Sequence, residues 1–141
     1  TQQLNFFFLG DRKKDGLYIV DLPGYGYAKV SRSLVNEWVK LMREYLRGRP
    51  NLRRVFVLVD GRHGLKDSDK ELMLMLDETA VSYQIVLTKI DKVKIAEQKK
   101  LVEKTQKAIV KNIAAHPIVL MTSSVKGYGL DELRGVIADL V

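Results

Sequence analysis

A short polar segment follows an early apolar run of the chain and carries residue types that could take part in chemistry. Asp21 comes directly after Leu17–Val20, which is the pattern of a buried strand, and Leu22, Pro23 and Gly24 come next. A Pro-Gly pair makes turns, and turns follow strands, so the segment has a purely structural interpretation. The alternative is that the tip of the strand is the edge of an active site, where the Asp21 carboxylate serves the reaction.

Two further polar segments follow later apolar runs. The sequence T-K-I-D at residues 88–91 comes after Ile85–Leu87, and T-S-S at residues 122–124 comes after Ile118–Met121. Taken singly, each segment has an ordinary explanation, because Asp91 could cap the next helix and SSVKGYG could be a plain surface loop. Their common position, directly after apolar runs, is what favours a shared site.

The elements that must position these segments alternate along the chain. Five apolar, β-rich runs are predicted as strands: Leu4–Leu9, Leu17–Val20, Val55–Val59, Ile85–Leu87 and Ile118–Met121. Four helical patterns are predicted: from Ser33 to near Gly48, from Ser68 as a possible cap through Leu76, from Ile95 to Ala114, and from Leu130 to Val141.

This alternation predicts an α/β fold, in which a mostly parallel sheet carries helices on both faces. The polar loop GDRKKDG joins the first two strands as a hairpin, which would add an antiparallel edge. Ligands bind at the carboxyl ends of the strands in such sheets. The three polar segments, and Asp60 after the run VFVLV, would therefore lie on one rim.

The order of the segments identifies a family. A strand-end Asp-x-x-Gly, then [NT]-K-x-D, then an S-[SA]-x loop is the GTPase series, so the chain resembles a P-loop GTPase of the translation-factor class. DLPGYGYAKV is similar to the DxPGYGxA signature of the EngB (YihA/YsxC) family of ribosome-biogenesis GTPases, and TKID fits that family's TKAD. TQQLNFF looks like the family's switch-one tail, and VLVDGRHG looks like its D-x-R-H segment.

The resemblance implies a site for GTP or GDP with Mg²⁺. Asp21 would face the Mg²⁺ through a coordinated water, because Mg²⁺ keeps several waters and few protein ligands. Thr1 matches the switch-one threonine that ligates Mg²⁺ directly, and Gly24 would offer its backbone N–H to the γ-phosphate. The further GTP-binding residues expected on this side are Gln2, Gln3, Leu22 and Pro23.

The resemblance also implies a guanine site. Asp91 would accept hydrogen bonds from the ring N–H and the exocyclic amine of guanine, a pair of donors that adenine does not offer. Lys89 would lay its apolar stem along the base, and Thr88 would brace the loops. The remaining residues expected around the base are Ile90, Thr122, Ser123 and Ser124, the last three closing the pocket around the guanine oxygen through backbone donors.

No catalytic residue can be assigned from the sequence. Tyr25 stands where many GTPases carry a water-orienting glutamine, so slow intrinsic hydrolysis is expected. A packing or partner-contact role for Tyr25 is equally compatible with its position. His63 could be a base, although a structural or partner-binding role is favoured because it lies in a different loop.

Composition narrows the remaining possibilities. The 141 residues are 46% hydrophobic and contain no cysteine, which favours a single domain over residues 1–141 and excludes disulfides and thiolate chemistry. No apolar run approaches a membrane span and no signal peptide is recognised, so a cytoplasmic protein without a membrane partner is expected. The net charge of +7 favours anionic partners such as nucleic acid. The lysine-rich segment KIDKVKIAEQKK is either a solvated helix face or a contact for ribosomal RNA.

The phosphate-binding loop of this class is not among these residues. G-x-x-x-x-G-K-[ST] does not occur, and with Thr1 matching switch one, the chain is interpreted as the carboxyl-terminal two-thirds of a GTPase that lacks the first strand and helix. The family resemblance implies GTP hydrolysis as a switch in assembly of the large ribosomal subunit, with its RNA as partner, and a need for the protein in normal division and septation. The alternative is a GTPase-like RNA- or protein-binding scaffold without hydrolysis. A monomer is favoured.

Overall fold

The computed structural model describes residues 4–11, 15–22 and 32–141, except for the side chains of residues 32–35 and 38. It divides the chain into two compact units, one of residues 1–50 with residue 141 and one of residues 51–140. The predicted single domain over residues 1–141 stays a prediction.

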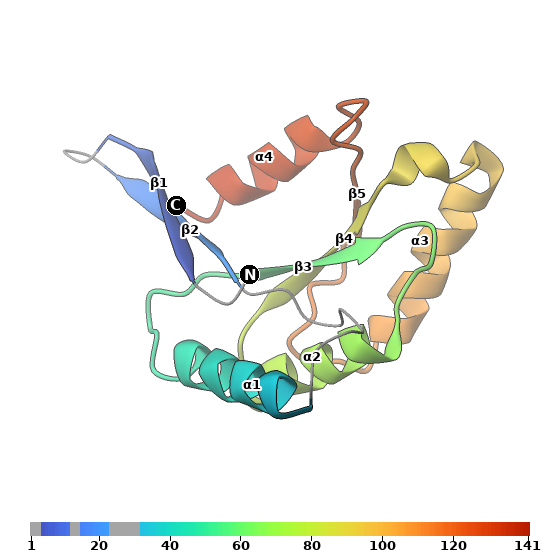
Figure 1. The fold of residues 1–141 in the computed structure, drawn as a ribbon. Coiled ribbons are helices and arrows are strands. Elements are labelled where there is room, and N and C mark those ends of the chain that lie inside the picture. The colour runs from blue at the N-terminus through green and yellow to red at the C-terminus, as the bar shows by residue number, and fades with distance from the viewer. Residues whose placement is uncertain (1–3, 12–14, 23–31) are drawn as a thin grey trace. The chain divides into compact units, whose positions relative to one another are not determined.

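The first unit contains an antiparallel hairpin. Strand β1 (Asn5–Gly10) pairs with strand β2 (Gly16–Asp21), as Figure 1 shows. The register places Asn5 opposite Asp21. Phe8 lies opposite Tyr18, with the ring centroids 5.1 Å apart, so an aromatic pair across the strands fixes the register. The predicted hairpin is confirmed. Strand β1 is displaced by one residue from the predicted run Leu4–Leu9, and β2 extends the predicted run Leu17–Val20 by one residue at each end.

The first unit also contains helix α1 (Arg32–Leu46), close to the predicted helix from Ser33 to Gly48. Met42, Tyr45 and Leu46 are buried on one side of its last turns. The Tyr45 ring meets Phe6 edge-on at 6.5 Å between centroids, and the Arg49 guanidinium lies 4.0 Å above the Tyr45 ring. This cation–π stack ties the segment after the helix back onto it.

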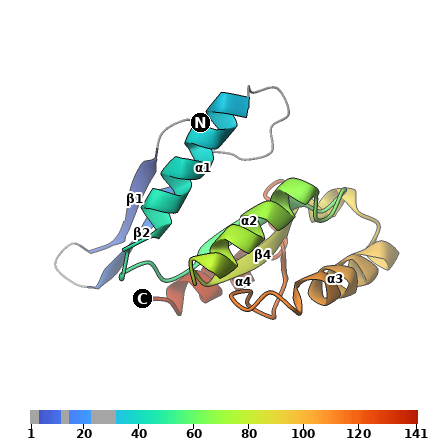
Figure 2. The same ribbon diagram turned by 90° about the horizontal axis from the view of Figure 1, so that it is seen from below.

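The second unit is a three-stranded parallel sheet with the order β3-β4-β5. Its strands are β3 (Val55–Asp60), β4 (Tyr83–Thr88) and β5 (Leu120–Met121). Its helices are α2 (Asp67–Glu78), α3 (Ile95–Ile109) and α4 (Leu130–Ala138), with a single 3₁₀ turn at Ile90–Lys92 before α3. Helices α2 and α3 cover one face and α4 the other, as the two views agree (Figures 1 and 2). The predicted α/β class is confirmed.

The core of the second unit lies around β4. Residues Tyr83 through Leu87 are all buried, so this strand is covered on both faces, as the apolar run Ile85–Leu87 predicts. Strand β3 instead alternates, with Val55, Val57 and Val59 buried. Helix α2 supplies Leu72, Met73, Met75 and Leu76 to the same core. In the described part of the chain, no helix has both the length and the apolar character needed to cross a membrane.

Strand β5 is shorter than predicted because of Pro117. Proline has no N–H to give to a ladder, and the N–H of Ile118 is used locally, donating to His116 Nδ1 at 3.1 Å. The Ile118 side chain is exposed, and pairing of β5 with β4 covers Leu120 and Met121, while Ala115 makes an isolated parallel bridge with Tyr83.

Helix α2 does not begin at a Ser68 cap. Asp69 accepts a hydrogen bond from the Lys66 backbone N–H at 2.8 Å, so Asp69 reaches back over the first turn and Ser68 lies inside it. Helix α3 ends at Ile109, five residues before the predicted end at Ala114. Asp77 explains this early end, because its carboxylate accepts hydrogen bonds from the side chain of Asn112 at 2.7 Å and from the backbone of Ala114 at 3.0 Å.

Replacing Asp77 with Ala is expected to lower the free energy of unfolding by about 2–3 kcal/mol, because two hydrogen bonds to a charged acceptor are lost and the Ala114 N–H is left without its acceptor. The midpoint of urea unfolding measures the change. Glu71→Ala, an exposed acid on the same helix, is the control and should shift the midpoint little. Equal shifts in the two variants would contradict this role for Asp77.

Candidate functional site

The carboxyl ends of the three parallel strands bring polar loops to one edge of the sheet. Asp60 lies beside Thr88 in the register of β3 and β4. The loops after β4 and β5 are joined by backbone hydrogen bonds, from Thr122 N to Leu87 O at 2.8 Å and from Ile90 N to Thr122 O at 3.1 Å. The structure therefore brings together two of the three polar segments singled out in the sequence.

Asp91 is held by the serine loop rather than by a helix cap. Ser123 Oγ donates a 2.8 Å hydrogen bond to Asp91 Oδ1. Helix α3 has Lys94 at its N-cap, so the capping explanation for Asp91 is wrong. Among the described residues, Asp91 Oδ2 accepts no hydrogen bond. One oxygen of a partly exposed carboxylate is thus oriented by the loop after β5.

The SSVKGYG segment is a closed loop with Ser123 at its base. Ser123 is fully buried, its Oγ accepts from Lys126 N at 3.1 Å, and its N–H donates to Tyr128 O at 2.9 Å. Gly129 closes the loop with φ 70°, and a Cβ there would collide with the carbonyl oxygen of Met121. Ser124, by contrast, is exposed. The loop is therefore built to hold one hydroxyl against Asp91.

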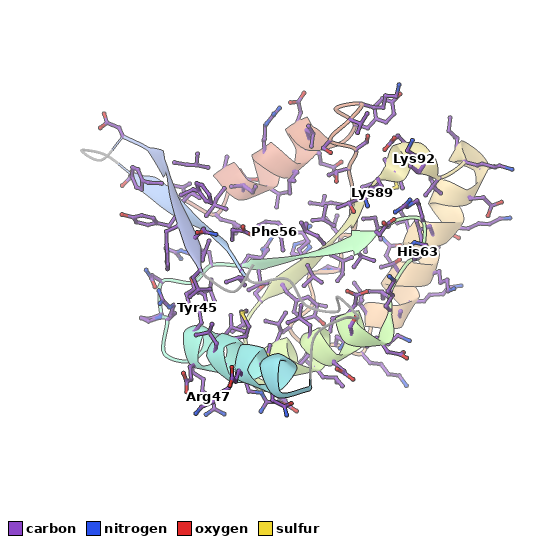
Figure 3. The ribbon with its side chains drawn as sticks, viewed as in Figure 1. Tyr45, Arg47, Phe56, His63, Lys89 and Lys92 are labelled. Atoms are coloured by element: carbon purple, nitrogen blue, oxygen red, sulfur yellow. The ribbon has the colours of Figure 1, made fainter. Side chains whose placement is uncertain are left out.

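The T-K-I-D segment is anchored from both sides. Thr88 Oγ1 donates to Val59 O at 3.3 Å, which links β4 to β3. Ile90 is buried, and its carbonyl oxygen accepts from Gln98 Nε2 of α3 at 3.2 Å. Lys89, between them, has a left-handed backbone with φ 55° and an exposed side chain (Figure 3).

Sequence reasoning placed Asp60 on the rim but gave no role to Asp60 or Arg62, and the structure brings Asp60 into contact with both Arg62 and Lys89. Asp60 Oδ2 lies 3.2 Å from Lys89 Nζ and 2.8 Å from Arg62 Nη2. The hydrogen bonds from the Arg62 side chain, with smaller contributions from the Arg62 backbone and Lys89, hold the pKa of Asp60 well below its usual range. The signal available in the sequence was position, because Asp60 ends its strand as Thr88 ends the next.

Of the other candidate residues, the structure describes Asp21, Leu22 and His63. Asp21 and Leu22 lie at the end of β2 in the first unit, where Asp21 is exposed. Thr1, Gln2, Gln3, Pro23, Gly24 and Tyr25 lie outside the described residues. His63 is exposed in the loop after β3, and its backbone N–H donates to Asp60 O at 3.1 Å. In the described ranges, no group of three or more acidic or histidine side chains is arranged to hold a metal ion.

Comparison with known proteins identifies the family of the chain. The family described as the elongation factor Tu GTP binding domain matches residues 38–141. The chain is 51% identical over 146 aligned residues to a Rhizobium johnstonii protein named "Probable GTP-binding protein EngB", covering 100% of the chain and 67% of the relative. The chain belongs to the EngB family.

Other EngB relatives match as closely along the chain. The Caulobacter vibrioides protein is 56% identical over 99% of the chain and 59% of its own length, and the Hyphomonas neptunium protein is 55% identical over 99% of the chain and 63% of its own length. The chain thus spans about three-fifths of the length of these two relatives.

Solved structures share the fold of this EngB chain at lower identity. Translation elongation factor SelB from Methanococcus maripaludis, in complex with the GTP analogue GppNHp, superposes with a TM-score of 0.72 at 22% identity, over 99% of this chain and 28% of that one. The apo form of the same factor gives a TM-score of 0.62 over 71% of this chain and 22% of that one. At this identity the likeness shows the fold alone.

Proposed function

We propose that the protein binds GTP and hydrolyses it to GDP, acting as a switch in assembly of the large ribosomal subunit. The observation that carries the proposal is the contact between Ser123 Oγ and Asp91 Oδ1, which fixes one edge of a carboxylate at the carboxyl end of the sheet. A cellular need for normal division and septation would follow from defective ribosome assembly. The protein would act in the cytoplasm and as a monomer.

The guanine base would bind between the loops after β4 and β5. Asp91 would accept the ring N–H and the exocyclic amine, a charge-assisted bidentate contact. The Lys89 stem would lie along the base. Ile90, which is buried, would anchor the loop after β4 in the core. Ser124 would donate its backbone N–H to the guanine oxygen. The N–H groups of Thr122 and Ser123 already donate to Leu87 O and Tyr128 O, so these two residues would hold the loop around the base instead. Thr88 would hold the loop to β3 through its contact with Val59.

The phosphates would bind beyond the end of β2. Asp21 has the chemistry that Mg²⁺ requires, since it is a single exposed carboxylate at a strand tip and Mg²⁺ needs few protein ligands. Asp21 would hold the ion through a water, and Thr1 would ligate it directly. Bound Mg²⁺ would supply neutralisation of phosphate charge. Gly24 would donate its N–H to the γ-phosphate, next to Gln2, Gln3, Leu22 and Pro23.

The experiment compares the full-length protein with residues 1–141 alone. The full-length protein should bind GDP at least about a hundredfold more tightly than ADP, because adenine lacks the donors that Asp91 pairs with. Residues 1–141 carry no G-x-x-x-x-G-K-[ST], so they should bind GTP very weakly and hydrolyse none detectably. Calorimetry measures binding and phosphate release measures hydrolysis.

Each result tests a different part of the proposal. Equal affinity for GDP and ADP in the full-length protein would remove the guanine assignment. Tight GTP binding by residues 1–141 would mean that other residues bind the phosphates. Slow phosphate release from the full-length protein is the expected intrinsic activity, given Tyr25 at the usual glutamine position. Binding without any hydrolysis would favour the scaffold, an alternative suggested by the missing phosphate-loop motif.

A further inference from the structure

The loop that follows β3 is held directly against the T-K-I-D segment. The Gly61 N–H donates to Thr88 O at 2.8 Å, and Thr88 Oγ1 donates to Val59 O in return. A Cβ on Gly61 would lie 2.8 Å from Thr88 O, closer than a carbon can approach, so this tight junction needs glycine. Asp60 therefore sits at a set distance from Lys89, the residue after Thr88.

The Asp60 carboxylate is oriented by Arg62. Asp60 Oδ1 accepts hydrogen bonds from the Arg62 backbone N–H at 3.0 Å and from Arg62 Nε at 3.1 Å, and Oδ2 accepts one from Arg62 Nη2 at 2.8 Å. These bonds fix the plane of the carboxylate, and only 22% of its side chain is exposed. Because Arg62 holds the pKa of Asp60 low, the carboxylate is ionised at any pH at which nucleotide binding is measured.

The Lys89 ammonium rests on this oriented carboxylate. Its Nζ lies 3.2 Å from Asp60 Oδ2, although 56% of the lysine side chain is exposed. A lysine stem has four rotatable bonds, so an exposed lysine without an anchor samples many rotamers. With its backbone in the left-handed conformation and its ammonium on Asp60, Lys89 is held at both ends. Figure 3 shows Lys89 at the same end of the sheet as His63, which belongs to the Asp60 loop.

We propose that Asp60, oriented by Arg62, is a positioning residue for the guanine site that pre-orders the Lys89 side chain for packing along the base. The inference rests on the proposed function, because it assigns Lys89 to the base. Asp60 acts through Lys89 and does not contact the nucleotide. The methylene stem packs against any purine ring, so Asp60 contributes affinity without reading the donors and acceptors of the base. Exposed ion pairs contribute little to folding, so the fold itself depends weakly on this pair.

The test measures GDP and inosine diphosphate affinities of the full-length protein by calorimetry. Asp60→Asn should weaken both nucleotides by the same factor, about three- to tenfold, because an unanchored lysine must be ordered on binding. The midpoint of thermal unfolding should change little. Glu97→Gln is the matched control, since Glu97 also pairs with a lysine, Lys100 at 3.9 Å, but on α3. It should leave both affinities unchanged.

A double-mutant cycle decides whether Asp60 acts through Lys89. In a Lys89→Met background, which keeps an apolar stem but has no ammonium, Asp60→Asn should cause no further loss of GDP affinity. Lys89→Arg should keep most of the wild-type affinity, because it retains the cation. If Asp60→Asn fails to fold, Arg62→Ala in the same two backgrounds gives the same comparison, since it releases the carboxylate that Lys89 uses.

Three results would overturn the inference. The first is unchanged GDP affinity in Asp60→Asn, and the second is an equal loss in the Lys89→Met background, which would mean that Asp60 acts through the fold. The third is a change in the ratio of GDP to inosine diphosphate affinity, which would mean that Asp60 reads the base. A wild-type protein that does not prefer GDP over ADP would instead overturn the proposed function, and the inference with it.

Discussion

Replacing Asp91 with Asn in the full-length protein should weaken GDP binding by about tens- to several-hundred-fold, which corresponds to about 2–4 kcal/mol. The carboxylate would no longer accept two hydrogen bonds from the guanine ring N–H and amine. The Asn side chain still has an oxygen that can accept the Ser123 hydroxyl, so the loop after β5 should keep its contact. The loss would therefore come from the base and not from the loop.

The same variant should bind xanthosine diphosphate more tightly than the wild type does. Xanthine carries a ring carbonyl where guanine carries its amine, and the amide N–H₂ of Asn can donate to that carbonyl. Competition between GDP and xanthosine diphosphate for a fluorescent nucleotide measures both changes at once. Asp131→Asn, the same substitution in the exposed first turn of α4, is the control. Unchanged GDP binding in Asp91→Asn would remove the guanine assignment.

The parts of the site that could be predicted from sequence are those determined by local residue patterns. The continuous apolar run of β4 and the polar T-K-I-D after it place Thr88 through Asp91 at the end of a buried strand, and the structure has them there. The direct contact between Asp91 and Ser123 joins residues 32 positions apart, and it follows only because parallel strands end at one edge.

The parts that could not be predicted depend on contacts between side chains. The sequence predicts Asp60 only as the polar residue at the end of one strand. The local pattern does not indicate that its carboxylate contacts Lys89, which follows the adjacent strand. The early end of α3 also depends on a side-chain contact. The helical pattern of the sequence continues to Ala114, but the Ala114 N–H donates a hydrogen bond to Asp77 of α2. Secondary-structure propensity depends on the residues of one segment, whereas these contacts come from other segments that pack against it.

Charge reversal at two exposed basic residues of the second unit, Arg53 and Lys104, should weaken binding to large ribosomal subunits by about ten- to a hundredfold. Lysine and arginine side chains bind RNA through its phosphates, so this contribution to binding does not depend on the base sequence. Arg53 is exposed before β3, and Lys104 is exposed on α3. The adjacent Arg54 is unsuitable for this test, since its Nη1 donates to Oε1 of the buried Gln84 at 2.8 Å and its charge reversal would damage the sheet.

The design uses Arg53→Glu with Lys104→Glu, and pelleting with purified large subunits over a range of salt concentrations. Wild-type binding should fall steeply with salt, and the double variant should bind more weakly with a salt slope lower by about 2, one for each phosphate contact removed. Binding should be tighter with a non-hydrolysable GTP analogue than with GDP, since the γ-phosphate is expected to order the glycine segment after Asp21. GDP affinity should be unchanged, because neither residue belongs to the base site.

The control is Lys66→Glu with Lys70→Glu, which makes the same change in net charge at the start of α2. If both pairs weaken the association equally, only the overall charge of the protein matters and no RNA-binding surface is defined. Pelleting that is indifferent to salt, to nucleotide and to Arg53 and Lys104 alike would exclude the large subunit as the partner. A loss confined to the Arg53 and Lys104 variant, with guanine affinity intact, would separate the surface that contacts RNA from the edge of the sheet that binds the base.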